Sequence, residues 1–182
     1  MKYIIALITI FAGLTGCSED PPEEYNRIII STLLSATWTA ECAVDVDGVN
    51  SYISTLVFTS DGGILYNSGT GTSSNSYYLE DTTCTVNEDF PVPEIRDSNT
   101  FSYTLGKNVT VNGSVAEITE ATEIDTTTNT SGGLITFGVA DYDILAIKDK
   151  YTLYFGNKED PDNGTTIDLR PTQLSESVIY TR

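Results

Sequence analysis

The side chains best suited to chemistry in this sequence are carboxylates that occur in close pairs along the chain. Two acids two positions apart on a strand share a face at about 7 Å, a separation that a glycoside hydrolase could use. Most of these acids fall in expected turns or on polar faces, where side chains are usually solvated. We therefore predict no enzyme activity and keep a glycan hydrolase as the alternative. The pairs are Asp45/Asp47, Asp141/Asp143, Glu120/Glu123 and Asp160/Asp162.

Two of these pairs lie in acidic loops whose clustered oxygens would suit calcium. Neither loop has the glycine and the final glutamate of an EF-hand at the required places. Both also fit ordinary turns, because Asp-Gly and Asn-Gly are hairpin residues. We predict no metal site, and the candidates that would contradict this are Asp45, Asp47, Asp160 and Asp162.

The overall composition excludes several classes of function. The 182 residues include 26 acidic and 9 basic side chains and no histidine, giving a formal net charge of −17. A histidine-based triad or a histidine-ligated zinc site is therefore excluded. The acid excess argues against nucleic acid as a partner, since that calls for a basic face. The sequence has no nucleophile elbow and no glycine-rich phosphate loop, and we predict no cofactor.

The N-terminus has the features of an export signal. Lys2 precedes an apolar run over residues 3–13, which is too short for a permanent membrane span. The run ends in Leu14-Thr15-Gly16-Cys17, which resembles the bacterial lipobox. The resemblance implies a signal peptide over 1–16, a palmitate-bearing lipid anchor on Cys17 and a tether over 17–22. It also implies a cell-envelope location, and Ser18 favours the outer membrane over the inner, with the periplasmic and surface faces left open.

Two cysteines remain if Cys17 is lipidated, namely Cys42 and Cys84. An even number of cysteines in an oxidising compartment indicates one disulfide bond. Two free thiols or a two-cysteine metal site is the alternative.

The hydrophobic pattern changes period near Trp38. Before it, Tyr25, Ile28, Ile29 and Leu33 share one helical face, so a short helix begins after Asp20, with a strand as the alternative. After it, short segments alternate between apolar and polar residues, separated by turn residues. Residues 115–125 fit either a strand or a helix, 106–108 suggest a turn and 126–133 a loop. The segments 76–79 and 82–86 are predicted to be extended. The predicted strands are 38–46, 51–60, 64–67, 101–105, 109–111, 134–139, 142–148, 151–155 and 177–180.

This pattern predicts an all-β protein, an antiparallel meander of about eight to ten strands that closes into a barrel over residues 23–182. A tryptophan at the start of the first strand and a late arginine are similar to the lipocalin pattern, in which that arginine packs across the tryptophan. Here the tryptophan is Trp38, Ala36 replaces the usual glycine, and the arginine is either Arg170 or Arg182. The domain also resembles uncharacterised lipocalin-like lipoproteins of proteobacteria. That second resemblance involves Trp38, Cys42, 54–58, 81–85, 123–125 and 169–171.

The expected function is non-catalytic binding of a small apolar or amphipathic ligand inside the barrel. A barrel of this size either holds one small ligand or is filled by its own side chains. A filled, acidic-surfaced lipoprotein that acts through an envelope protein partner is therefore the alternative, and Trp38 could equally plug the closed end. The inward aromatic candidates include Tyr151 and Tyr180, and those assigned to the ligand are Trp38, Tyr52, Phe58, Phe101, Tyr103, Tyr142 and Phe155.

Overall fold

The fold is described here from a computed structural model. The described residues are 23–61, 67–112, 115, 117–132, 135–160 and 162–182. The predicted signal peptide, Cys17 and the tether lie outside these residues, as does most of the strand predicted over 64–67.

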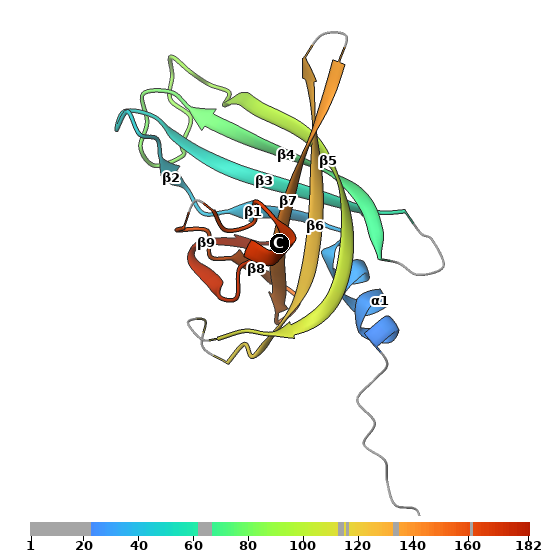
Figure 1. Ribbon diagram of the computed structural model, residues 1–182. Coiled ribbons are helices and arrows are strands. Elements are labelled where there is room, and N and C mark those ends of the chain that lie inside the picture. The colour runs from blue at the N-terminus through green and yellow to red at the C-terminus, as the bar shows by residue number, and fades with distance from the viewer. Residues whose placement is uncertain (1–22, 62–66, 113–114, 116, 133–134, 161) are drawn as a thin grey trace, which may run out of the picture.

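Antiparallel strands form a closed barrel, and a short helix precedes them in the chain (Figure 1). This arrangement confirms the predicted fold class. Eight strands, β1 and β3 to β9, follow one another around the ring, and β1 closes it by pairing with both β9 and β3. The short strand β2 pairs with the start of β3. The elements are α1 Glu23–Leu34, β1 Thr37–Ala40, β2 Ala43–Val44, β3 Ser51–Ser60, β4 Ser68–Tyr78, β5 Glu94–Thr110, β6 Glu120–Gly132, β7 Ile135–Lys148, β8 Thr152–Gly156, the short 3-10 helix η1 Ile167–Leu169, and β9 Leu174–Thr181.

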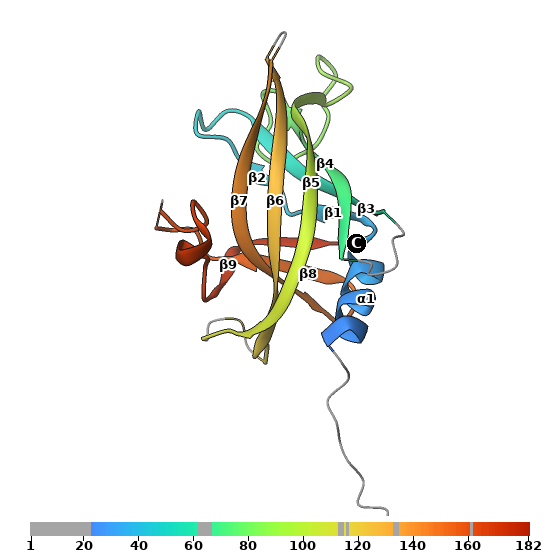
Figure 2. The same ribbon diagram turned by 45° about the vertical axis from the view of Figure 1, so that its right-hand side comes forward.

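Helix α1 packs against one end of the barrel (Figure 2). Leu34 and Trp38 are fully buried, and the indole Nε1 of Trp38 donates a hydrogen bond to the carbonyl of Leu34 at 2.9 Å. The guanidinium of Arg182 lies 5.0 Å from the centre of the Trp38 ring and donates to the carbonyl of Leu33. Of the two arginines that the sequence left open, Arg182 is therefore the one that packs across the tryptophan.

Two glycines of β4 make room for aromatic rings inside the barrel. A Cβ atom at Gly71 would lie 2.3 Å from the Phe101 ring, and one at Gly69 would lie 2.7 Å from the Tyr103 ring. Such distances are far below van der Waals contact, so only glycine fits at either position. The rings of Phe101 and Tyr103 in turn pack edge-on against Phe58.

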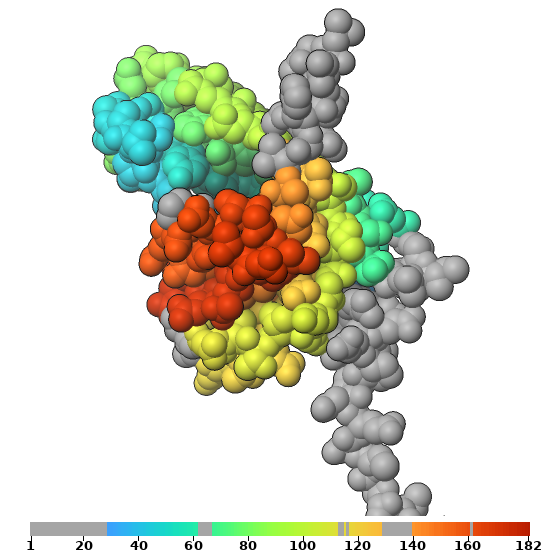
Figure 3. Space-filling model, viewed as in Figure 1, coloured from blue at the N-terminus to red at the C-terminus, as the bar shows by residue number. Residues whose placement is uncertain are grey.

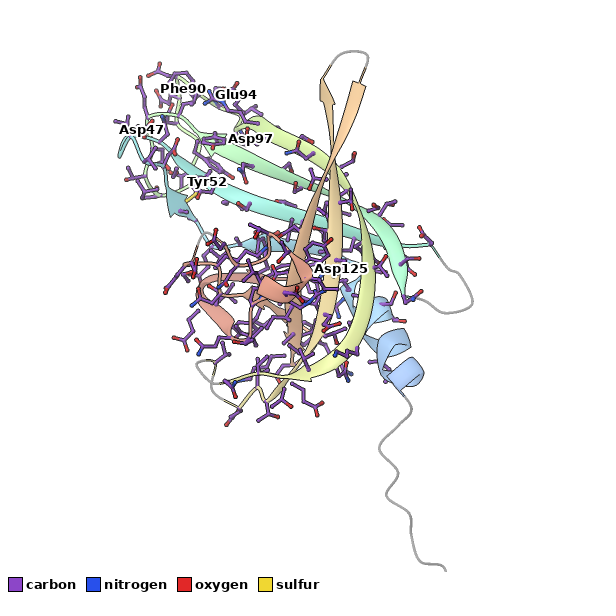
Figure 4. All side chains as sticks on the ribbon, in the orientation of Figure 1. Asp47, Tyr52, Phe90, Glu94, Asp97 and Asp125 are labelled. Carbon is purple, nitrogen blue, oxygen red and sulfur yellow. A yellow bond between two sulfur atoms is a disulfide. The ribbon has the colours of Figure 1, made fainter. Side chains whose placement is uncertain are left out.

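A lobe formed by β2, the turn 45–50, the adjoining ends of β3, β4 and β5, and the loop 79–93 extends beyond the ring of strands (Figure 4). The disulfide Cys42–Cys84 holds it together, as predicted. Within the loop, the Asp81 carboxylate accepts hydrogen bonds from the backbone N–H groups of Thr85 and Thr83, which lower the pKa of Asp81 to about 2. The lobe is therefore fixed by a covalent link and by local hydrogen bonds.

Five predictions of local structure were wrong. The strand predicted over 38–46 is divided into β1 and β2, and the two strands predicted over 134–139 and 142–148 are one strand, β7. Residues 126–132 continue β6 instead of forming a loop, because β5 and β7 pair with the strand on both sides. Residues 106–108 lie inside β5 as an irregularity in its pairing, not as a turn. Residues 82–86 belong to a loop and not to a strand, and Cys84 has a φ of 55°, a left-handed conformation incompatible with an extended strand.

Replacing both disulfide cysteines with serine should lower the free energy of unfolding by about 3 kcal/mol, because the bond closes a loop of 42 residues in the unfolded chain. The measurement is urea unfolding of the double variant and of the oxidised and reduced wild-type protein. Reduced wild type should behave like the variant, and far-UV circular dichroism should keep the β signature in all three. Identical unfolding midpoints would contradict the prediction.

Candidate ligand cavity

The barrel contains a cavity of about 490 Å³. This volume lies within the range of pockets that hold one small ligand. In Figure 3 the surface is hollowed between the blue-green residues of the lobe and the red C-terminal segment. Side chains of β3 to β9 and of the segment after β8 line the cavity: Leu56, Phe58, Ser73, Phe101, Ile124, Thr126, Thr128, Asp141, Asp143, Phe155, Gly156, Asn157, Lys158, Glu159, Ser175, Ser177, Val178 and Tyr180.

Three of the seven aromatic residues that the sequence assigned to the ligand line this cavity, namely Phe58, Phe101 and Phe155. Phe58 and Phe101 meet edge to face with ring centres 5.4 Å apart. Tyr180, expected to point inward, also lines the cavity and packs edge-on against Phe155 at 5.9 Å. Two pairs of rings, from four strands, therefore contribute apolar surface to the cavity.

The other four residues lie elsewhere. Trp38 and Tyr103 are buried in the core with α1, so they pack the closed end instead of lining the cavity. Tyr52 stacks on Tyr77, because this first part of β3 pairs with β2 and belongs to the lobe. Tyr142 lies on β7 between Asp141 and Asp143, which line the cavity, so its side chain faces the other side of the sheet. Tyr151, also expected inward, is 62% exposed.

One of the carboxylate pairs, Asp141 and Asp143, lies in the cavity wall together with Lys158. The Lys158 ammonium is 2.5 Å from Asp141 Oδ2 and 3.0 Å from Asp143 Oδ2. The other Asp143 oxygen accepts hydrogen bonds from the backbone N–H groups of Ile144 and Gly156, at 2.7 and 2.9 Å. We call Asp141, Asp143 and Lys158 the charged trio.

The trio differs in its exposure and its pKa shifts. Burial raises the pKa of Asp143, which is 6% exposed, and the nearby Lys158 ammonium opposes that shift. Burial lowers the pKa of Lys158, but the charges of Asp143 and Asp141 outweigh this effect and leave the pKa above its ordinary value. Since both oxygens of Asp143 already accept hydrogen bonds or a salt bridge, its carboxylate ties β7 to β8 and positions Lys158. Glycoside hydrolysis requires one carboxyl group that donates a proton and a second that acts as base or nucleophile, and an ammonium that bridges the two carboxylates supports neither role.

The acids considered for calcium stabilise turns. Asp47 Oδ1 accepts hydrogen bonds from the N–H groups of Asn50 and Val49, which lower the pKa of Asp47. Asp160 accepts from the N–H of Asp162 at 3.0 Å. Among the described residues no group of three or more acids or cysteines is placed to hold a metal ion.

Arg170 fixes the segment that follows β8, a role that the sequence did not indicate. Its side chain is 9% exposed, and Nη1 donates to the carbonyls of Ile124 and Asp143 at 3.2 and 2.5 Å. Its Nη2 forms a salt bridge with Asp125, and its guanidinium lies 5.7 Å from the centre of the Tyr142 ring. The loop that presents Lys158 to the cavity is thereby held against β6 and β7.

Comparison with protein-family models, curated proteins and solved structures found no match for this chain. The assignment of function therefore depends on the cavity and on the sequence features of the N-terminus. Within the part of the chain that the structure describes, no helix combines the length and apolar character needed to cross a membrane.

The buried ionisable groups predict loss of stability at alkaline pH. Burial raises the pKa of Tyr103 and of Tyr180, and the pKa of Lys158 is also raised. Because the folded state holds these protons more tightly than the unfolded state, their contribution is complete below about pH 10 and is lost as pH rises through the folded pKa values. The melting temperature, measured from pH 8 to 12, should fall above pH 10. Tyr103→Phe, which keeps the ring and removes the hydroxyl, should show a shallower fall, and an identical profile would contradict this origin.

Proposed function

We propose that the protein binds one small apolar or amphipathic molecule inside its barrel, without catalysis, while anchored to the cell envelope by lipid on Cys17. The observation that supports binding is the cavity of about 490 Å³ with its wall of aromatic rings. A filled barrel would leave no such space. Helix α1 closes one end, and none of its described residues lines the cavity.

Binding is tested with the neutral fluorescent probe N-phenyl-1-naphthylamine and the mature chain, which is the chain from Cys17 onward. Wild type should enhance the probe's fluorescence in a saturable way. Thr126→Trp places a large ring in the cavity wall and should weaken binding at least tenfold. Thr104→Trp is the matched control, because Thr104 lies on β5 and its side chain is exposed.

Two outcomes would contradict the binding proposal. One is the absence of saturable binding by wild type. The other is equal binding by Thr126→Trp and wild type, which would move the probe to the outer surface. Native mass spectrometry of protein taken gently from its host's envelope then identifies the natural ligand by a mass that leaves on denaturation.

The lipid anchor is a separate part of the proposal, supported by the lipobox-like residues before Cys17. It implies attachment to the envelope, with the outer membrane favoured by Ser18. Radiolabelled palmitate should enter the full-length protein and not Cys17→Ala. Equal labelling of the two proteins would contradict the anchor.

A second function, docking of an envelope protein, is favoured by one feature of the lobe. Six of the eleven large hydrophobic side chains that are exposed among the described residues lie on it. Val46→Asp and Val92→Asp should then remove the protein from a larger complex on native gels of envelope extracts. Unchanged migration would exclude this function. The six are Val44, Val46, Val49, Val86, Val92 and Ile95.

A further inference from the structure

The cavity has one apolar wall and one charged wall. Phe58, Phe101 and Phe155 represent the apolar wall, and the charged trio with Glu159 represents the other. An occupant that touches both walls must have an apolar body and a polar head. The charges of the second wall therefore decide which head groups fit.

These charges are predominantly negative. Asp141, Asp143 and Glu159 carry three carboxylates, whereas Lys158 supplies one ammonium. That ammonium already contacts both Asp141 and Asp143, so it is not available as the sole partner of an incoming anion. Asp141 contacts Lys158 through Oδ2 but is still 42% exposed at its side chain, and Glu159 is exposed, so both carboxylates can be reached from solvent.

The charge of the whole chain adds to the negative potential of the cavity lining. The chain as a whole has a formal net charge of −17. A carboxylate or phosphate head would meet repulsion both during approach and at the cavity wall, whereas an amine would be attracted at each stage. Ser175 and Ser177, which also line the cavity and bond to each other, have hydroxyl oxygens that can accept a hydrogen bond from an ammonium.

We propose that the cavity selects its ligand by charge and takes amphiphiles whose polar head is an amine, with Asp141 and Glu159 as the residues that recognise it. This inference depends on the proposed binding function. Burial of the ligand's apolar chain provides the binding itself. The two carboxylates determine which of several ligands with the same apolar chain binds most tightly.

The test compares three twelve-carbon compounds that differ only in the head group: dodecylamine, dodecanol and dodecanoate. Each displaces N-phenyl-1-naphthylamine from the mature chain at pH 7.5 and fixed ionic strength, below its micellar concentration. We expect dodecylamine to bind at least tenfold more tightly than dodecanol, and dodecanoate at least tenfold more weakly. Raising the salt concentration should reduce both differences in affinity, because salt screens the charges of the head groups and of the cavity.

Matched variants separate the cavity wall from the overall charge. The double variant Asp141→Asn with Glu159→Gln should reduce the preference for dodecylamine over dodecanol at least fivefold. Asp162→Asn with Asp168→Asn removes the same number of charges outside the cavity lining and should preserve the preference.

Each outcome has a distinct meaning. If none of the three compounds displaces the probe and the probe itself does not bind, the proposed binding function fails. If dodecanoate binds as tightly as dodecylamine, binding stands and selection by charge is overturned. If both double variants lose the preference equally, the overall field causes it, and the assignment to Asp141 and Glu159 is overturned.

Discussion

Trp38→Ala is expected to lower the free energy of unfolding by about 4 kcal/mol, the cost typical of removing a fully buried aromatic side chain from a core. Trp38 has no exposed surface and packs in the cluster that includes Leu34 and Leu153. Its removal also leaves the carbonyl of Leu34 without the indole donor and Arg182 without the ring beneath it. Helix α1 should therefore loosen before the barrel unfolds. Chemical denaturation measures the first effect, and amide hydrogen exchange in α1 measures the second.

Two further variants define the origin of that loss. Trp38→Phe retains a ring but no N–H donor, and it should recover more than half of the lost stability. Val46→Ala removes a side chain that is fully exposed and should leave stability unchanged. If Trp38→Ala were no more destabilising than Val46→Ala, the closed end of the barrel would not depend on Trp38.

Arg170→Met is expected to cost about 3 kcal/mol, because the guanidinium is nearly buried and pairs with two backbone carbonyls and with the carboxylates of Asp125 and Glu123 at once. Methionine fills similar space but donates no hydrogen bond. The segment after β8, which forms part of the cavity lining, should separate from β6. We therefore expect probe affinity to fall together with stability, as followed by urea unfolding and by fluorescence titration.

The matched variants for Arg170 distinguish the effect of the guanidinium's planar shape from the effect of its charge. Arg170→Lys keeps the positive charge but lacks the planar fork, so it should recover less than half of the stability. Arg96→Met removes an exposed arginine that pairs with Glu94 on β5, and no measurable change is expected. Full recovery by lysine would show that the charge alone is sufficient.

The elements rich in β-branched and aromatic residues could be predicted from the sequence. The strand predicted over 51–60 is β3 with the same bounds, because such residues favour strands and a turn signal follows them. The pairing of Cys42 with Cys84 followed from their number and from the expected oxidising compartment, once Cys17 was assigned to lipid. Neither conclusion needed knowledge of distant contacts.

The strands without apolar alternation could not be predicted. Residues 126–132 of β6 have no apolar face, because their inward positions Thr126 and Thr128 line the cavity and not the packed core. The inward positions Gly69 and Gly71 of β4 are empty because rings from β5 occupy that space. Pairing with neighbouring strands, and not their own hydrophobicity, keeps these segments in the sheet.

The sequence by itself determined that this chain forms a closed β-barrel with one disulfide, since periodicity and cysteine count are local properties. Tertiary structure decided that Arg182 and not Arg170 covers Trp38, and that Asp141 and Asp143 face Lys158. Arg182 and Trp38 lie near opposite ends of the described chain, whereas Asp141 and Lys158 are 17 residues apart on segments that the pairing of β7 with β8 brings together. These contacts form only because the register of eight paired strands, and the return of the C-terminal segment across them, brings those side chains within reach.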